Sequence, residues 1–157
     1  MGKSGLKISK NPRRGAEHAS GRKTEFAAFV TETASAAKKI GIIRRGVRAR
    51  VVDDMADYLD VSKNVVFGIL KTPGSTAHKL IRDNRTLDSA ASERVVRVAD
   101  ITRMTEQAFG GRSAATQWLK TPNLGLAGAT PLSMLDTEVG ASEVRRILSS
   151  VEYGGVF

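Results

Sequence analysis

Apolar side chains recur at helical spacing along most of the chain, with breaks at Gly, Pro, Ser and Thr. The longest stripe follows Asp88, and the pair Gly110-Gly111 ends it. Pro131 occupies a favourable first helical position. Further helical stripes are predicted over residues 24–40, 47–60, 63–71, 75–82, 113–119 and 141–151. No stretch alternates as a strand would, so the sequence predicts an all-α fold.

Two short helices joined by a tight turn are predicted between residues 62 and 85. The run Thr72-Pro73-Gly74 is the turn signal, because Pro fixes φ and Gly permits a positive φ. This arrangement is typical of a helix-turn-helix, whose second helix enters the major groove and contacts phosphates and base edges. The candidate DNA-contacting residues are Ser75, Thr76, His78, Lys79, Arg82 and Arg85.

The charge is distributed unevenly along the chain. Residues 1–50 hold 13 Lys and Arg against 3 Glu, whereas residues 51–157 hold 12 against 13 Asp and Glu. Residues 1–23 mix Gly, Ser, Pro and basic residues without periodicity, which predicts a disordered basic arm. A cationic half favours a nucleic-acid partner, and a solvated tail that only aids solubility is the alternative.

Nothing in the sequence assembles a catalytic site. The absence of Cys removes thiolate metal sites and cysteine nucleophiles, and neither His18 nor His78 has metal ligands around it. The acidic residues between Asp53 and Asp60 are typical of a solvated helix face, and a hydrolase that used them would lack a base and a nucleophile. The run from Gly21 departs from a phosphate loop at Arg22. We therefore expect no enzyme, no cofactor and no metal.

The sequence also bears on location. The basic N-terminus has no apolar signal-peptide core, and no apolar run approaches the length of a membrane span. We expect a cytoplasmic protein that does not bind a membrane.

Two segments resemble a known family. Residues 87–99 read LDSAASERVVRVA, and the run from Trp118 reads WLKTPNLGLAGATPL. The first resembles the LspxESxRxxRxA segment of the Xre/MbcA/ParS-type antitoxins, with Ala91 in place of the usual Glu. The second is similar to their C-terminal toxin-binding region, with Ala127 in place of the first Gly of a common Gly-Gly. The resemblance covers about residues 60–157, and Thr72 stands where an apolar residue is usual.

The resemblance implies an antitoxin with an Xre-like helix-turn-helix domain and a small helical toxin-binding domain. Its partner would be a RES-type toxin, which destroys NAD, or a related ADP-ribosyltransferase, and the antitoxin would cover the active-site cleft of that toxin. The complex would contain an antitoxin homodimer and repress its own promoter. The expected parts are a disordered arm (1–23), a DNA-binding and dimerisation domain (24–110) and a toxin-binding domain (111–157).

The toxin contacts expected from the resemblance are Trp118, Pro122, Asn123, Leu126, Pro131, Arg145, Glu152, Tyr153, Gly154, Val156 and Phe157. Two roles stay open for Trp118: an anchor of the small C-terminal core, or a direct contact. The end Val156-Phe157 is either a frayed terminus or a plug that enters the toxin.

A helix-turn-helix regulator without a toxin is the alternative function. It gives no reason for the low charge of residues 118–135, which hold one charged side chain before Asp136.

Overall fold

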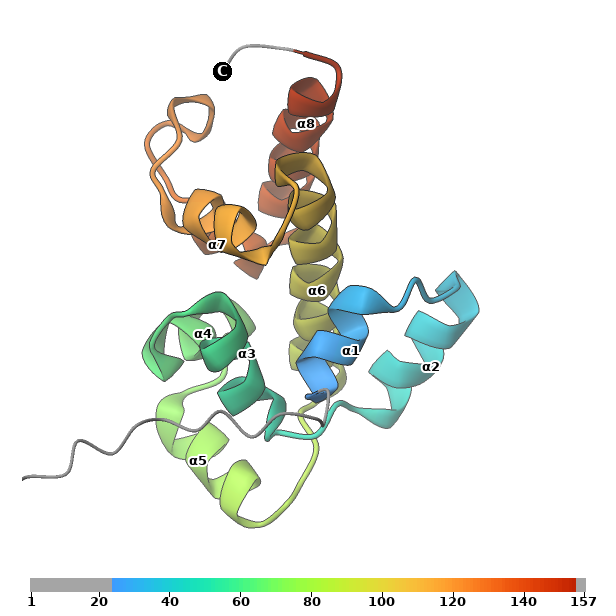
Figure 1. Cartoon of the computed structure of the whole chain (residues 1–157). Coiled ribbons are helices and arrows are strands. Elements are labelled where there is room, and N and C mark those ends of the chain that lie inside the picture. The colour runs from blue at the N-terminus through green and yellow to red at the C-terminus, as the bar shows by residue number, and fades with distance from the viewer. Residues whose placement is uncertain (1–23, 155–157) are drawn as a thin grey trace, which may run out of the picture.

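The computed structural model describes residues 24–154, and all the regular elements of this range are helical, as predicted (Figure 1). An isolated antiparallel bridge joins Arg48 to Thr86. The elements are α1 (Glu25–Thr31), α2 (Ala36–Arg45), α3 (Val51–Leu59), α4 (Lys63–Leu70), α5 (Gly74–Arg82), α6 (Ser89–Phe109), α7 (Arg112–Lys120), the 3-10 helices η1 (Leu124–Leu126) and η2 (Leu132–Asp136), and α8 (Glu138–Glu152).

The long helix α6 is the axis around which the other helices are arranged. Figure 1 shows α1 to α5 around its N-terminal half, and α7 and α8 around its C-terminal half. Its start and end are as predicted: the Asp88 carboxylate accepts the Ala91 N–H at 2.7 Å, and Gly110 ends the helix with a φ of 79°. Val96 and Ala99 are buried in addition to the predicted apolar face, because neighbours pack on more than one side of α6.

Two predicted helix boundaries are wrong because a hydroxyl side chain caps a helix at a position that the apolar pattern does not mark. The stripe over residues 24–40 is divided, since the Ser35 hydroxyl accepts the Lys38 N–H at 3.3 Å and starts α2. Helix α2 also continues past residue 40, where the predicted stripe ends, to Arg45. The last helix starts at Glu138, before the predicted Ala141, because Thr137 caps it.

Two further boundaries differ near the helix-turn-helix. The stripe that begins at Val47 becomes helical only at Val51, because the Val47 carbonyl accepts the Leu87 N–H at 2.7 Å in a non-helical pairing. Helix α5 begins at Gly74, directly after Pro73 and one residue before the predicted start.

The apolar core is continuous across residue 110. One cluster of buried side chains runs from Phe26 in α1 through Met55 and Ile101 to Leu135 and Leu148 in the C-terminal part. The helix-turn-helix and the C-terminal helices therefore share α6 as a common wall. No helix within residues 24–154 is long and apolar enough to cross a membrane.

Candidate functional site

The helices α4 and α5 form the predicted helix-turn-helix. The turn after α4 places Lys71 in the left-handed region, with a φ of 54°, and the Thr72 N–H donates to the Phe67 carbonyl at 3.1 Å. Ala77 is fully buried and fastens α5 to the core. The opposite side of α5 is therefore left free for a partner.

All the predicted DNA-contacting side chains are exposed: Ser75, Thr76, His78, Lys79, Arg82 and Arg85. The His78 ring meets the Phe67 ring edge-on, with 5.3 Å between centroids, which positions it on the surface of α5. Arg82 donates from Nε to the Asp83 carboxylate at 3.1 Å, in an exposed ion pair. Their contact with DNA stays a prediction.

Asn123 organises the loop between α7 and α8. Its Oδ1 accepts the Gly125 N–H at 2.8 Å, and its carbonyl accepts the N–H groups of Leu126 and Gly128 at 3.0 Å. Its own N–H donates to the Ala129 carbonyl at 3.0 Å. An Asn side chain stabilises a turn in this way because it is short enough to reach the backbone two residues on. The predicted contact residue Asn123 thus shapes the loop.

Three of the predicted toxin contacts face inward. Leu126 is 6% exposed and Pro131 is buried, so a partner does not reach their side chains in this structure. Trp118 is half-buried, and its ring packs on that of Phe109 with 5.3 Å between centroids. The packing favours the core role for Trp118. Leu126 and Pro131 support the loop from inside in this structure, and their contact with a toxin stays a prediction.

The surface of the C-terminal part is formed by other residues. Leu124, at the loop tip, is 97% exposed and Tyr153, after α8, is 90% exposed, while Pro122, Glu152 and Gly154 are exposed as well. In Figure 1 the loop and the end of α8 lie at the end of the molecule away from α5. Sequence reasoning missed Leu124, because the neighbouring leucines of this loop are alike in sequence and only packing separates the buried one from the exposed one.

Three other predictions fall on residues that the structure does not describe. Val156 and Phe157 lie beyond the described range, and so does the predicted arm of residues 1–23.

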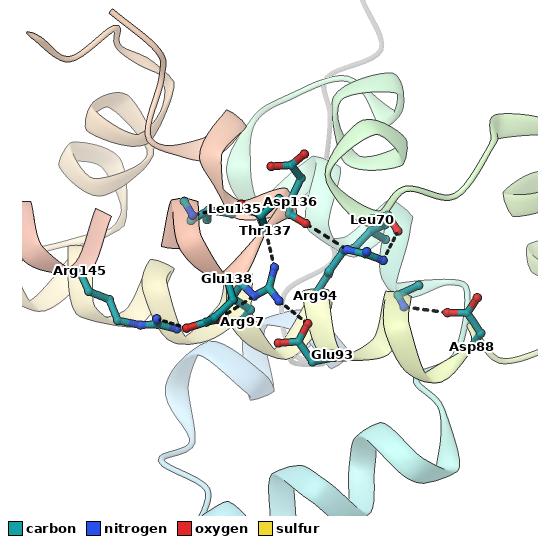
Figure 2. Close-up of polar contacts among 12 residues, drawn as sticks. Leu70, Asp88, Glu93, Arg94, Arg97, Leu135, Asp136, Thr137, Glu138 and Arg145 are labelled. Atoms are coloured by element: carbon teal, nitrogen blue, oxygen red, sulfur yellow. Dashed lines mark hydrogen bonds and ion pairs between the residues drawn. The ribbon is translucent and has the colours of Figure 1, made fainter. Parts of the chain in front are cut away.

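Arg94 of α6 joins the helix-turn-helix to the C-terminal part (Figure 2). It donates to the Leu70 carbonyl at the end of α4 and to the Asp136 carbonyl at the end of η2, both at 3.2 Å. Carbonyls at a helix end have no intrahelical donor, so a guanidinium satisfies two of them at once.

Arg97, one turn further along α6, is 9% exposed. It donates to the Leu135 carbonyl at 3.1 Å and to the Glu93 carboxylate at 2.6 Å. Its Nε lies 3.2 Å from Glu138, an ion pair without the angle of a hydrogen bond, and the half-exposed Arg145 pairs with the same Glu138 at 2.6 Å (Figure 2). The network links α6, η2 and α8.

Two more residues of the segment over residues 87–99, Ala91 and Ser92, are buried in the structure. The Ser92 hydroxyl is buried, accepts the Val47 N–H at 2.9 Å and donates to the Leu87 carbonyl at 3.4 Å. Ala91, which replaces the usual Glu, is 2% exposed. These two positions therefore contribute structural contacts.

Helix α7 fastens the other side of the C-terminal part to α3. Arg112 donates to the carbonyls of Asp57 and Tyr58 at 3.0 Å, and its guanidinium carbon lies 3.9 Å from the centre of the Tyr58 ring. Lys120 lies 2.8 Å from the Asp60 carboxylate, and this hydrogen bond and charge lower the pKa of Asp60. Both cations lie where the C-terminal end of α3 carries negative partial charge.

The acidic residues of α3 do not converge on one site. Asp53 pairs with Lys63 at 2.6 Å, whereas Asp60 pairs with Lys120 of α7. Among residues 24–154, no three His, Asp or Glu side chains are placed to hold a metal ion. The hydrolase hypothesis receives no support from this arrangement.

Two family models match the chain in succession. Residues 39–100 match the antitoxin Xre-like helix-turn-helix domain, which covers α3, α4 and α5. Residues 104–154 match the antitoxin Xre/MbcA/ParS C-terminal toxin-binding domain, which covers α7, the loop and α8. The two matches are separated by three residues within α6, so this helix is shared by both domains.

Curated proteins with similar sequences are named as antitoxins. A protein of Sphingobium sp. named Prs ADP-ribosylating antitoxin is 30% identical over 150 residues, which are 89% of this chain and 94% of the relative. The protein named Antitoxin Xre from Photorhabdus laumondii is 29% identical over 117 residues, 72% of this chain and 77% of the relative. An Antitoxin Xre from Yersinia enterocolitica is 32% identical over 117 residues, with 71% and 76% covered.

Proposed function

The chain belongs to the Xre/MbcA/ParS antitoxin family, and we propose that the toxin it neutralises is an enzyme that consumes NAD. It is an antitoxin whose C-terminal part, residues 104–154, is a toxin-binding domain. Two observations support NAD as the substrate of the toxin. The name of the Sphingobium relative refers to ADP-ribosylation, and the family resemblance implies a RES-type toxin. Both reactions begin with NAD.

The exposed side chains of the toxin-binding domain are the observation that carries the proposed interface. Leu124 and Tyr153 are large, and almost their whole surface is in contact with water. Exposed apolar and aromatic groups of this kind suit a protein partner, because their burial releases water and a Tyr also offers a hydroxyl. The interface consists of the loop tip and the end of α8, with Pro122, Arg145 and Glu152 beside them.

The segment from Glu152 to Phe157 enters the NAD cleft of the toxin. A cleft that binds NAD accepts a planar ring and a pyrophosphate, so it presents an apolar slot beside cationic side chains. Phe157 suits the slot, while Glu152 suits the cations through charge-assisted hydrogen bonds. Gly154, with a φ of 78°, allows a backbone path that few other residues adopt. Neutralisation is then steric occlusion, without catalysis by the antitoxin.

A chain that ends at Glu152 tests this mechanism. We expect it to bind the toxin through the loop and α8 and to leave NAD consumption measurable in the complex. A full-length variant with Val156→Ser and Phe157→Ser is the matched control for chain length, and it should also leave activity. Complete protection by the shortened chain would contradict the occlusion mechanism while leaving toxin binding intact.

The class of toxin is tested by its product. Hydrolysis of NAD yields nicotinamide and free ADP-ribose, whereas an ADP-ribosyltransferase releases nicotinamide and leaves the ADP-ribose on an acceptor. We expect the product of the neighbouring gene to co-purify with this chain and, after separation, to consume labelled NAD. Label that stays free indicates a RES-type enzyme, and label on protein indicates a transferase. A neighbouring protein that does not bind would favour a regulator without a toxin.

The antitoxin also binds its own promoter as a homodimer and represses it. The exposed residues of α5 and the match to the Xre-like helix-turn-helix domain support this proposal. Replacement of Lys79 and Arg82 by Ala should weaken binding and lower the salt dependence by about one unit of slope for each phosphate that is no longer neutralised. A gel-shift titration at several salt concentrations measures this, and unchanged affinity would exclude α5 as the DNA-binding helix.

A further inference from the structure

A group of exposed arginines lies outside α5. Residues 44–50 read RRGVRAR and contain four arginines and no acid; they comprise the last two residues of α2 and the connection to α3. We call this segment the arginine turn, and its members are Arg44, Arg45, Arg48 and Arg50, all exposed. Glu25 of α1 is the acid whose charge acts on Arg48. The segment thus presents a concentrated positive surface.

The arginine turn is held against the loop that follows α5. The bridge between Arg48 and Thr86 is reinforced by the Ala49 N–H, which donates to the Arg85 carbonyl at 2.9 Å. Gly46 has a φ of 81°, and a Cβ at this position would lie 2.7 Å from the Leu87 carbonyl oxygen. The close approach therefore depends on a glycine at this position.

These hydrogen bonds place the arginine turn next to the exposed Arg85. In Figure 1 the end of α2, the loop before α6 and α5 all lie at the same end of the molecule. The toxin-binding loop and the end of α8 lie at the other end.

We propose that the arginine turn is a second DNA-binding element, which holds the phosphate backbone beside the groove that α5 enters. This inference rests on the DNA binding proposed above. A guanidinium binds phosphate with two parallel hydrogen bonds, and four such groups on a fixed backbone form a strong anion-binding surface. Phosphate contacts fix the register of a protein on the duplex, whereas base contacts specify the sequence.

Helix α5 carries few cations, so strong binding to the DNA phosphates calls for a flanking cationic element. Within α5 only Lys79 and Arg82 are formally cationic at neutral pH, and Arg82 is engaged with Asp83. Because each neutralised phosphate contributes to affinity by releasing counterions, four additional arginines outweigh what α5 supplies itself. In this arrangement α5 reads the sequence, and the arginine turn adds electrostatic affinity through the phosphates beside the groove.

The test compares the full-length protein with an Arg48→Ala/Arg50→Ala variant on two duplexes, the DNA upstream of its own gene and a mixed-sequence duplex. Fluorescence anisotropy over a range of salt concentrations gives the slope of log affinity against log salt. We expect the slope to fall by about two units, with weakening by a similar factor on both duplexes. The matched control, Lys38→Ala/Arg146→Ala, removes two exposed cations that pair with Glu32 and Glu143, and it should change the slope little.

Each outcome decides between the proposals. If the arginine variant keeps the slope of the unmodified protein while Lys79→Ala/Arg82→Ala loses affinity, the arginine turn does not bind DNA, although α5 does. If the arginine variant keeps its DNA affinity and fails only to bind toxin, the surface serves the toxin and the inference is wrong. If the unmodified protein binds neither duplex, the proposed DNA binding itself fails. Circular dichroism of each variant checks that it folds.

Discussion

At the scale of single residues, the segment over residues 87–99 acts through backbone carbonyls. Arg94 donates hydrogen bonds to backbone carbonyls at the ends of α4 and η2. Arg97 donates to a backbone carbonyl of η2 and forms ion pairs with two glutamates. A Lys offers one compact ammonium at these places and does not span two carbonyls, because it lacks the planar fork of a guanidinium. The two arginines therefore position the toxin-binding domain relative to the helix-turn-helix.

Replacement of Arg97 by Ala should lower the free energy of unfolding by about 1–3 kcal/mol, since it leaves the Leu135 carbonyl without its donor and Glu93 without its partner, while Glu138 keeps Arg145. The side chains of Glu93 and Glu138 are in contact with water, which limits the loss in free energy of unfolding. Urea unfolding followed by circular dichroism measures the effect. Arg146→Ala removes an exposed pair with Glu143 and should cost less than about 1 kcal/mol, so equal losses in the two variants would contradict the role given to Arg97.

Gly140 is a second residue whose identity is dictated by packing. It lies in the first turns of α8, and a Cβ there would overlap the backbone carbonyl of Met134 in η2. Gly140→Ala should therefore destabilise the protein by roughly 1–3 kcal/mol despite the better helix propensity of Ala. Gly68 in α4 is the matched control, because nothing lies within 4 Å of its Cβ position. Thermal unfolding should show Gly68→Ala to be neutral or stabilising, and a stabilised Gly140→Ala would refute the overlap.

At the scale of elements, the sequence predicts a helix well where the residues that cap, bury and end it lie within that helix or directly beside it in the sequence. Helix α6 is predictable from Asp88 to Gly110 because its cap, its apolar stripe and its terminating glycine are all local. The start of α8 is harder to predict, because the Thr137 cap lies ahead of the apolar stripe, and the need for Gly140 arises only from its contact with Met134 of η2. The candidate site follows the same rule: exposure of α5 is predictable from its polar face, whereas the burial of Leu126 depends on contacts distant in sequence.

The contact between α3 and α6 can be followed by the titration of Tyr58. Burial, followed by the hydrogen bond to Glu106 at 2.7 Å and the charge of Glu106, raises the pKa of Tyr58 to about 12 from an ordinary value of 10. Because the folded value is the higher one, the associated stability is complete below pH 10 and is lost as the pH rises towards 12.

With Tyr153→Phe, Tyr58 is the one tyrosine left of two, so ultraviolet absorbance reports it alone. We expect a midpoint near 12, and Glu106→Gln should lower it because the amide carries no charge. A midpoint near 10 in the folded protein would show that α3 and α6 do not make this contact.

At the scale of the whole molecule, α6 separates two surfaces of different character. Its 21 residues span roughly 30 Å. Figure 1 shows α5 and the end of α2 near its N-terminal end, and the loop between α7 and α8 and the end of α8 towards its C-terminal end. Arg94 and Arg112 fasten the C-terminal part to α4 and α3, so the two surfaces keep a fixed relation to each other.

This separation predicts that toxin and DNA bind at the same time. A gel shift of promoter DNA with the antitoxin should give one complex, and addition of the toxin should give a slower one instead of free DNA. A change to one surface should also leave the function of the other intact. The Lys79→Ala/Arg82→Ala variant should still neutralise the toxin, and the chain that ends at Glu152 should still bind DNA. This independence is expected because the residues changed lie at opposite ends of α6 and neither set contributes to the shared core. Release of DNA on addition of toxin, or loss of both activities in either variant, would show that the surfaces overlap or that α6 transmits a change between them.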